Sequence, residues 1–224
     1  MSLLSSLNSP VINHATLSSL LSDYVRPNDK ISELIKKNKI SPLKRGLYLV
    51  INNSQPSPEL MANHLYGPSY VSRHWALSFY GLLSERVSDI TSMCLERPRR
   101  VTTADYSFDY KKIPINYYAV GIESIQQHGI AFMMATPEKS LSDLLVTTRN
   151  LRIQSAGAML SYLENDLRLD AEDLLHFKLS RIEHYATQGY KSEMLGHLVS
   201  AIKILQNAPV RHSSKTLNEV GDND

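Results

Sequence analysis

Cysteine is nearly missing from this sequence of 224 residues, which contains only Cys94. A single thiol excludes a disulfide framework, and it excludes every metal site built from several cysteines. Cys94 lies in an apolar stretch and is expected to be a buried thiol. The scarcity of cysteine fits a reducing compartment, so we expect a cytoplasmic protein that binds no metal and no other cofactor.

Long apolar runs are missing as well. No stretch of the sequence approaches the roughly 18–20 apolar residues that a membrane-spanning helix needs. The N-terminus has no positively charged region ahead of a long apolar segment, so we expect no secretory signal. These two absences predict a protein without a membrane partner.

The signatures of common enzyme classes are also absent. Gly67, Gly81, Gly121 and Gly129 are isolated from one another, so they form no glycine-rich phosphate loop. None of the eight histidines pairs with another at the spacing of two metal ligands on one helix face. We therefore assign no catalytic residue and do not expect an enzyme.

Two alternatives to a non-enzymatic regulator remain open. Asp89, followed by Asp109 and Lys111, has the acid and then acid-x-lysine order of a magnesium-dependent nuclease, although a strand-end salt bridge would use the same residues. A nuclease-like or nucleotide-modifying domain would then occupy residues 85–150. Alternatively, residues 190–206 could expose their apolar stripe and act as the docking surface of a protein-interaction module.

Charge is nearly balanced over the whole chain but unevenly distributed. The formal net charge is +2, with 24 basic and 22 acidic side chains. Residues 1–55 carry a net charge of +4, and the remainder carries −2. Such asymmetry indicates either an N-terminal module that faces a polyanion or a solvated basic face without a partner.

The N-terminal pattern matches the parts of a winged helix-turn-helix. Residues 14–24 and 28–38 each place apolar side chains on one side of a helix, and residues 44–51 predict a turn followed by a strand. A helix fits the DNA major groove, and nearby lysines neutralise phosphates. The segment 28–38 is therefore the candidate recognition helix, and the basic turn after it is the candidate wing.

We expect double-stranded DNA to contact eight side chains of this module. They are Asn28, Lys30 and Ser32 at the groove-facing end, Lys36, Lys37 and Lys39 facing phosphates, and Lys44 and Arg45 at the start of the wing. A second basic cluster, Arg97, Arg99 and Arg100, lies between two predicted strands. It could add phosphate contacts or form a solvated hairpin.

The remaining sequence predicts a larger α+β body. Helical patterns cover residues 58–83 in two pieces, with an interruption at 67–69. Strands are predicted over 89–95, 101–109, 115–122 and 130–135, and Thr136-Pro137-Glu138 has the composition of a helix start. Three further helices are expected over 152–164, 170–187 and 190–206.

These patterns predict an α+β fold with three segments along the chain. Residues 1–55 form a winged-helix DNA-binding domain. Residues 56–206 form a mixed α/β domain with a helical C-terminus. Residues 207–224 are polar and form a disordered tail.

Three stretches carry a resemblance to a known family. They are Ile40-Ser-Pro-Leu-Lys-Arg-Gly-Leu-Tyr48, Tyr70-Val-Ser-Arg-His-Trp-Ala-Leu-Ser-Phe-Tyr-Gly-Leu82, and Ala135-Thr-Pro-Glu-Lys-Ser-Leu-Ser-Asp-Leu-Leu145. In order and spacing they resemble the AbiEi-type antitoxins of bacterial abortive-infection (type IV) toxin–antitoxin systems. Trp75 stands where this family more often has a small serine, and Tyr80 where it more often has histidine.

The resemblance implies a function that the composition alone does not. It implies a winged-helix head on an α/β antitoxin domain, and a transcriptional regulator that represses its own toxin–antitoxin operon. It implies a nucleotidyltransferase-like toxin as the functional partner, opposed without a stable complex between the two proteins. The expected cellular role is antiviral defence.

Overall fold

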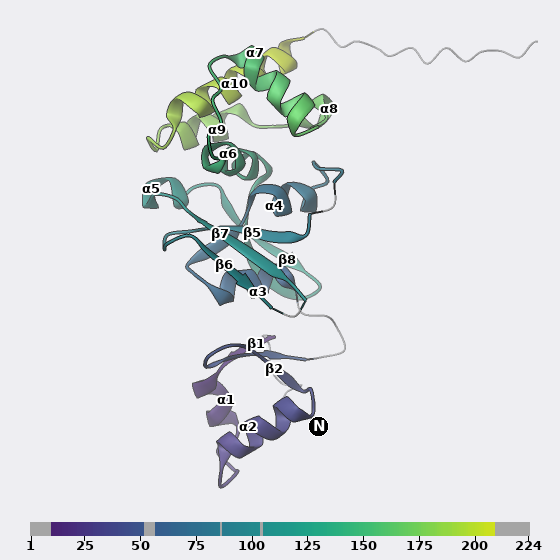
Figure 1. Ribbon diagram of the computed structural model, residues 1–224, viewed down its shortest axis with the longest axis vertical. Helices are drawn as coiled ribbons and strands as arrows, with labels where there is room; N and C mark the ends of the chain where they lie inside the picture. The colour runs from purple at the N-terminus through teal and green to yellow at the C-terminus, as the bar shows by residue number, and fades with distance from the viewer. Residues whose placement is uncertain (1–9, 52–56, 86, 104, 209–224) are drawn as a thin grey trace, which may run out of the picture.

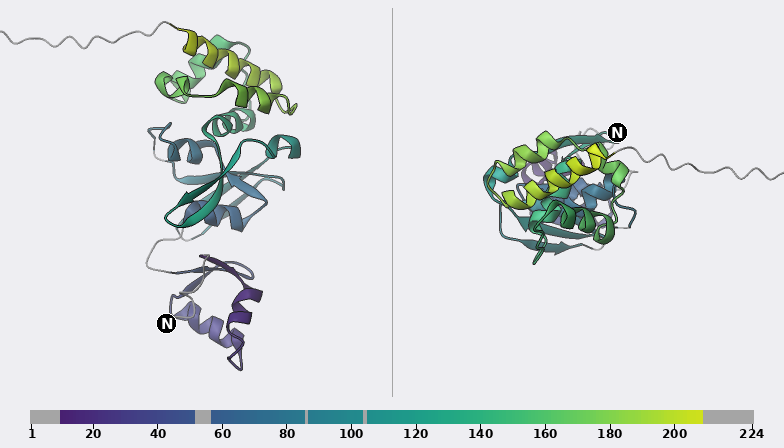
Figure 2. Two further views of the ribbon diagram at one scale, coloured as in Figure 1. Left: turned by 180° about the vertical axis from the view of Figure 1, so that it is seen from behind. Right: turned by 90° about the horizontal axis from the view of Figure 1, so that it is seen from above.

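The computed structural model describes residues 10–51, 57–85, 87–103 and 105–208 and has mixed α+β architecture. The predicted α+β class is confirmed. Three parts follow one another along the long axis: the N-terminal head, a sheet layer and a helical layer (Figure 1). Figure 2 shows the same order from behind. The predicted disordered tail lies outside the described residues except at 207 and 208.

The head consists of two helices and a three-stranded antiparallel sheet. Its elements are β1 (Val11–Asn13), α1 (His14–Leu20), α2 (Pro27–Lys36), β2 (Ile40–Lys44) and β3 (Leu47–Val50), with strand order β1-β3-β2. The Asn13 side chain caps α1 by accepting a hydrogen bond from the Thr16 amide at 2.8 Å. Pro27 occupies the first turn of α2, where its missing N–H costs nothing.

The head has a small apolar core of its own. Six buried side chains form it: Ile12, Leu17, Leu21, Ile31, Ile40 and Val50. Both predicted helices are confirmed, with somewhat shorter bounds. The strand β1 was not predicted, because three residues are too short to show an alternating pattern.

The sheet layer is a six-stranded mixed sheet with the order β6-β7-β5-β4-β9-β8. Its elements are α3 (Pro58–Leu65), β4 (Ser69–Val71), α4 (Arg73–Phe79), β5 (Asp89–Cys94), β6 (Arg99–Thr102), β7 (Ser107–Lys112), α5 (Ile115–Tyr118), β8 (Ile122–Gln127), β9 (Ile130–Ala135) and α6 (Pro137–Thr147). The helix α3 covers the face toward the head, and α4 and α6 cover the opposite face (Figure 1). Among the described residues, no helix has the length and apolarity needed to cross a membrane.

Two sequence predictions for this layer were wrong. The segment 101–109 is not one strand, because the chain turns between β6 and β7 and forms a hairpin. The segment 115–122 is mostly helix α5 and a turn, because Pro114 starts the helix and Tyr117 is buried in the core. Gly121 then takes a φ of +73°, and a Cβ there would lie 2.7 Å from the Tyr185 hydroxyl oxygen.

The helical layer follows the sheet layer along the chain. It contains α7 (Ala156–Ser161) with its π-helical continuation η1 (Tyr162–Asp166), α8 (Ala171–Leu175), α9 (Leu179–Ala186) and α10 (Ser192–Asn207). Leu195, Leu198 and Ile202, from the predicted stripe, are fully buried against the rest of this layer and α6. The stripe is therefore core, and the interaction-module alternative loses the observation that motivated it.

A buried ion pair lies at the centre of the body. Lys139 and Asp143 are one turn apart on α6, both side chains have zero exposure, and Nζ lies 2.9 Å from Oδ1. The Lys139 ammonium also donates to the Tyr117 carbonyl oxygen at 3.0 Å. Asp143 Oδ2 accepts hydrogen bonds from the Tyr70 hydroxyl at 2.9 Å and the Ser72 hydroxyl at 2.6 Å. Burial lowers the pKa of Lys139, against the opposing attraction of Asp143.

We call these five residues the α6 hub. The hub joins the strand β4, the helix α5 and the helix α6 in one buried network. The Lys139 ammonium and the Tyr70 and Ser72 hydroxyls each donate to an acceptor, whereas the buried Tyr117 hydroxyl has no hydrogen-bond partner among the described residues. A buried charge that loses its partner is strongly unfavourable, so the network couples these elements energetically.

Removing one hub charge is predicted to destabilise the whole protein. Asp143→Ala leaves the Lys139 ammonium buried without its carboxylate, and we expect a loss of about 3–5 kcal/mol in the free energy of unfolding. The measurement is urea unfolding followed by circular dichroism. The double variant Lys139→Met with Asp143→Leu should lose less than the sum of the two single changes, because it leaves no unpaired charge.

The exposed pair between Arg168 and Glu85 is the matched control. Both side chains are about 70% exposed, with 71% for Arg168 and 70% for Glu85. Glu85→Ala should therefore cost between zero and about 1 kcal/mol. Equal losses for Asp143→Ala and Glu85→Ala would contradict the role of the hub.

Candidate nucleic-acid interface

The outward side of α2 carries three of the residues assigned to DNA. Asn28, Ser32 and Lys36 are exposed and stand one turn apart, while Ile31 faces the head core. The Ser32 hydroxyl donates to the Asn28 main-chain carbonyl oxygen at 3.0 Å. The structure therefore brings these three side chains together on one polar surface.

Lys30 and Lys37 are brought together by a residue that sequence reasoning missed. Glu33 lies between them, with Oε2 at 2.9 Å from the Lys30 Nζ and Oε1 bonded to the Lys37 Nζ. The Lys30 ammonium also lies 5.1 Å from the centre of the Tyr24 ring. Spacings of three and four residues on a helix could have revealed this network. Glu33 compensates part of the charge that the two lysines would present to phosphates.

Lys39 and Arg45 stand at the two ends of β2. Both are exposed, and neither forms an ion pair with a described residue. Arg45 lies in the turn between β2 and β3, next to Gly46 with a φ of +75°. Together with Lys36, these two side chains are the uncompensated cations of the predicted DNA surface.

Lys44 instead connects the head with the body. Its ammonium donates to the His64 carbonyl oxygen at 2.6 Å and to the Leu65 carbonyl oxygen at 3.2 Å. Those carbonyls end the helix α3, where partial negative charge favours a cation. The partners are separated by 20 and 21 residues, so no local pattern announces the contact.

The second basic cluster lies at an edge of the sheet. Arg97 and Arg99 are exposed, and the Arg99 guanidinium lies 5.3 Å from the centre of the Tyr66 ring. Arg100 forms an ion pair with Asp89, so its charge is largely compensated. Only Arg97 lies in the connection between two strands, as predicted; Arg99 and Arg100 begin strand β6, which starts earlier than the predicted strand 101–109.

The residues of the nuclease alternative do come close to one another. Asp89 and Asp109 lie on the neighbouring strands β5 and β7 and line one hollow. Asp109 Oδ2 lies 3.2 Å from Arg73 Nη1 and 3.3 Å from Lys111 Nζ, and Asp89 pairs with Arg100. Both carboxylates are thus engaged by cations. Among the described residues, no group of three or more His, Cys, Asp or Glu side chains could hold a metal ion.

Comparison with known proteins gives no further identification. No protein-family model matches the chain, and a search of curated proteins finds no match.

The contacts of Glu33 with Lys30 and Lys37 predict a lowered pKa for the Glu33 carboxyl group. Hydrogen bonds from Lys37 and Lys30 lower the pKa of Glu33 to about 2. Because the folded pKa lies below the ordinary value of 4.5, this carboxylate contributes stability above pH 4.5. That contribution is lost as the pH falls through about 2.

Carboxyl carbon NMR should record this titration directly. The Glu33 midpoint should lie well below the ordinary value of 4.5, and it should rise toward that value at about 1 M salt, where ion pairs are screened. A Glu33 midpoint near 4.5 at low salt would show that the network does not form in solution.

Proposed function

We propose that this protein is a DNA-binding regulator whose head contacts double-stranded DNA. The observation that carries the proposal is the arrangement of the head. Two helices pack on a three-stranded sheet, the second helix has a polar outer side, and a basic hairpin turn follows it. From this order of elements we infer a winged helix, with α2 as recognition helix and the β2–β3 turn as wing.

Dimensions and charge support this proposal. A helix about 10–12 Å across fits the major groove, which is about 12 Å wide. Asn28 and Ser32 have side chains that can hydrogen-bond to base edges, and Lys36 stands on the same exposed side. Lys39 and Arg45 extend the uncompensated positive charge to the hairpin, where it would meet the phosphate backbone.

The further proposal is that the protein is the antitoxin of a type IV toxin–antitoxin system. The resemblance to the AbiEi-type antitoxins supports it, and the third matched stretch, residues 135–145, contains Lys139 and Asp143 of the α6 hub. In this proposal the protein represses its own operon. It opposes a nucleotidyltransferase-like toxin without forming a stable complex with it.

The nuclease-like alternative receives less support from the geometry. A metal-dependent nuclease needs carboxylates free to hold the metal ion. Here Asp109 is shared by Arg73 and Lys111, and Asp89 is bound to Arg100. We therefore favour a binding protein over an enzyme.

The double variant Lys36→Ala with Arg45→Ala tests DNA binding by the head. Fluorescence anisotropy should detect salt-dependent binding of the wild-type protein to the DNA upstream of its own gene. The variant should bind all duplexes more weakly. The slope of log affinity against log salt should fall by about 2, since each lost phosphate contact removes about 0.9.

Lys203→Ala is the matched control for charge. Lys203 is exposed on α10, far from the head along the chain, and forms no ion pair with a described residue. Its removal should leave the salt slope unchanged. If the wild-type protein bound upstream and shuffled duplexes with equal affinity at low salt, sequence-specific regulation would be contradicted. If the slope of log affinity against log salt were unchanged in the double variant, DNA binding by the head would be contradicted.

Co-expression tests the antitoxin proposal separately. Production of a nucleotidyltransferase-like protein encoded beside this gene should arrest growth of the host cells, and co-production of this protein should restore growth. Affinity purification of either protein should not recover the other. Failure to restore growth would refute antitoxin activity and leave the DNA-binding prediction intact, whereas stable co-purification would refute the type IV mechanism.

A further inference from the structure

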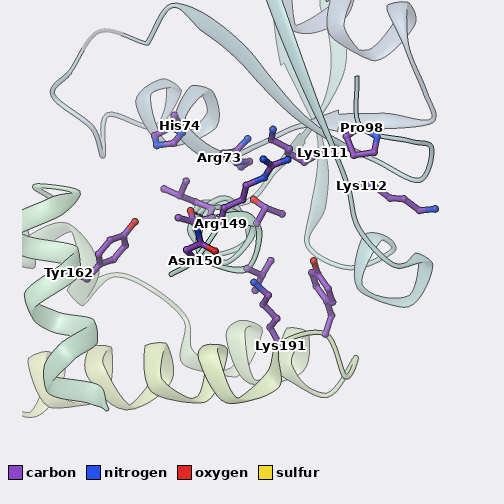
Figure 3. A pocket seen from close by; sticks show the side chains of 14 residues that line it. Arg73, His74, Pro98, Lys111, Lys112, Arg149, Asn150, Tyr162 and Lys191 are labelled. Atoms are coloured by element: carbon purple, nitrogen blue, oxygen red, sulfur yellow. Dashed lines mark hydrogen bonds between the residues drawn. The ribbon is translucent and has the colours of Figure 1, made fainter. Parts of the chain in front are cut away.

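A basic cleft lies in the body, outside the proposed DNA surface. It is a hollow of about 590 Å³ between the sheet layer and the helical layer. Five positively charged side chains line it: Arg73, Lys111, Lys112, Arg149 and Lys191. His74 also lines it, but burial and the Arg73 charge lower its pKa, so it adds little positive charge. No aspartate or glutamate is among the described residues of its lining. Figure 3 shows that these side chains come from separate segments: Arg73, Lys111 and Arg149 lie near one another in this view, whereas Lys112 points away from them.

The positive charge in this cleft is largely uncompensated. Asp109 lies beside the cleft and is shared by Arg73 and Lys111, at 3.2 and 3.3 Å. Lys112, Arg149 and Lys191 form no ion pair with any described residue. Like charges gathered in a concave site repel one another and attract anions, because the cleft concentrates the field.

The negative end of the α6 dipole neutralises only part of the positive charge in the cleft. The helix ends at Thr147, beside the cleft, and its dipole places roughly half a negative charge there. The Thr147 and Thr148 hydroxyls bond the carbonyl oxygens of Asp143 and Leu144 in the last turn. Even with this helix end and Asp109 included, the cleft retains an excess of positive charge.

Arg73 is the buried cation of the cleft, and its backbone has an uncommon conformation. It is only 9% exposed and takes a φ of +59°, a conformation that residues other than glycine seldom adopt. Ser72, which precedes it, is fixed by the Asp143 carboxylate and by a bond from the Thr91 hydroxyl to its carbonyl oxygen at 2.6 Å. The Arg73 Nε is buried without a partner among the described residues. Residues that their surroundings hold in an uncommon backbone conformation are typical of binding sites.

The size of the cleft fits a small molecule. Pockets for small ligands have volumes of about 300–1,000 Å³ and combine apolar walls with a few convergent polar groups. Leu144 and Val146 are buried residues of this lining, and Tyr162 and Tyr190 are half-buried ones. One buried arginine, several cations at the rim and aromatic side chains in one hollow together suit a phosphorylated compound with an organic part better than they suit the outer backbone of a duplex.

We propose that this cleft binds a phosphorylated small molecule of nucleotide size, carrying at least two negative charges. Arg149 and Lys191 at the rim bind the phosphate groups, and Arg73 supplies positive charge from below. The tyrosines and the apolar residues contact the organic part. This site is separate from the DNA surface, so the proposal does not depend on the function of the head.

Isothermal titration calorimetry of the full chain tests the proposal. The probes are sodium phosphate, pyrophosphate, AMP and ATP at constant ionic strength. We expect pyrophosphate and ATP to bind and phosphate to bind much more weakly, because the cleft offers several cations. ATP should bind more tightly than pyrophosphate, because the cleft also contacts the organic part of the ligand. Equal affinities for ATP and pyrophosphate would identify inorganic polyphosphate as the ligand class and would contradict the proposal of a nucleotide-sized ligand.

Charge variants locate the site. Arg149→Ala and Lys191→Ala are exposed substitutions, and each should weaken ATP binding about tenfold or more, the loss expected for one charge-assisted hydrogen bond. Arg149→Glu should abolish it. Lys203→Ala, an exposed lysine elsewhere in the helical layer, should leave it unchanged. Circular dichroism confirms that each variant is folded.

Three outcomes would overturn the proposal. The first is no heat and no thermal stabilisation with any probe at millimolar concentration. The second is ATP binding that survives Arg149→Glu and Lys191→Glu together. The third is that these variants bind duplex DNA more weakly, while pyrophosphate and ATP do not compete with DNA for the wild-type protein. That result would assign the cleft to a DNA interface instead.

Discussion

The ion pair between Lys139 and Asp143 is the interaction on which the body of the protein depends. Two full charges without solvent exposure persist only because each has several partners. Asp143 accepts hydrogen bonds from Tyr70 within strand β4 and from Ser72 just after it, and Lys139 donates to the carbonyl oxygen of Tyr117 in α5. The strand, the short helix and the central helix α6 therefore have one relative arrangement.

The consequences of this pair extend to both neighbouring surfaces. The bond to Ser72 fixes the backbone at Arg73 and thereby the base of the basic cleft. Beside the pair, Glu138 accepts hydrogen bonds from the Lys178 amide and the Arg181 guanidinium, each at 3.1 Å, which attaches the helical layer. The head is joined differently, through Lys44 and a shared apolar contact in which Leu43 and Leu49 pack with α3. A stable body thus carries a head with a core of its own.

Local patterns in the sequence predicted part of this structure. Thr136-Pro137-Glu138 starts α6 as predicted, with the Thr136 hydroxyl accepting from the Lys139 amide at 3.2 Å. The amphipathic patterns of α1, α2 and α10 also predicted helices correctly. The strand prediction over 115–122 failed, because apolar residues with β preference there are buried by a short helix, and tertiary packing outweighs such preferences. The hub escaped notice because its partners are up to 73 residues apart.

The candidate sites also divide into features that local sequence patterns predict and features that depend on residues far apart in the sequence. The exposed row of Asn28, Ser32 and Lys36 follows from helix periodicity, whereas the junction role of Lys44 follows only from the folded arrangement. The basic cleft gathers residues from β7, α4 and the segments after α6 and before α10, and no single stretch of sequence contains its charge pattern.

Amide hydrogen exchange with and without the upstream duplex tests the central claim most directly. If the head binds DNA, the duplex should add protection within residues 27–46, over α2 and the β2–β3 turn, and should leave α7 to α10 unchanged. Protection centred on the sheet or the helical layer, or no change anywhere at low salt, would contradict the assignment of DNA binding to the head.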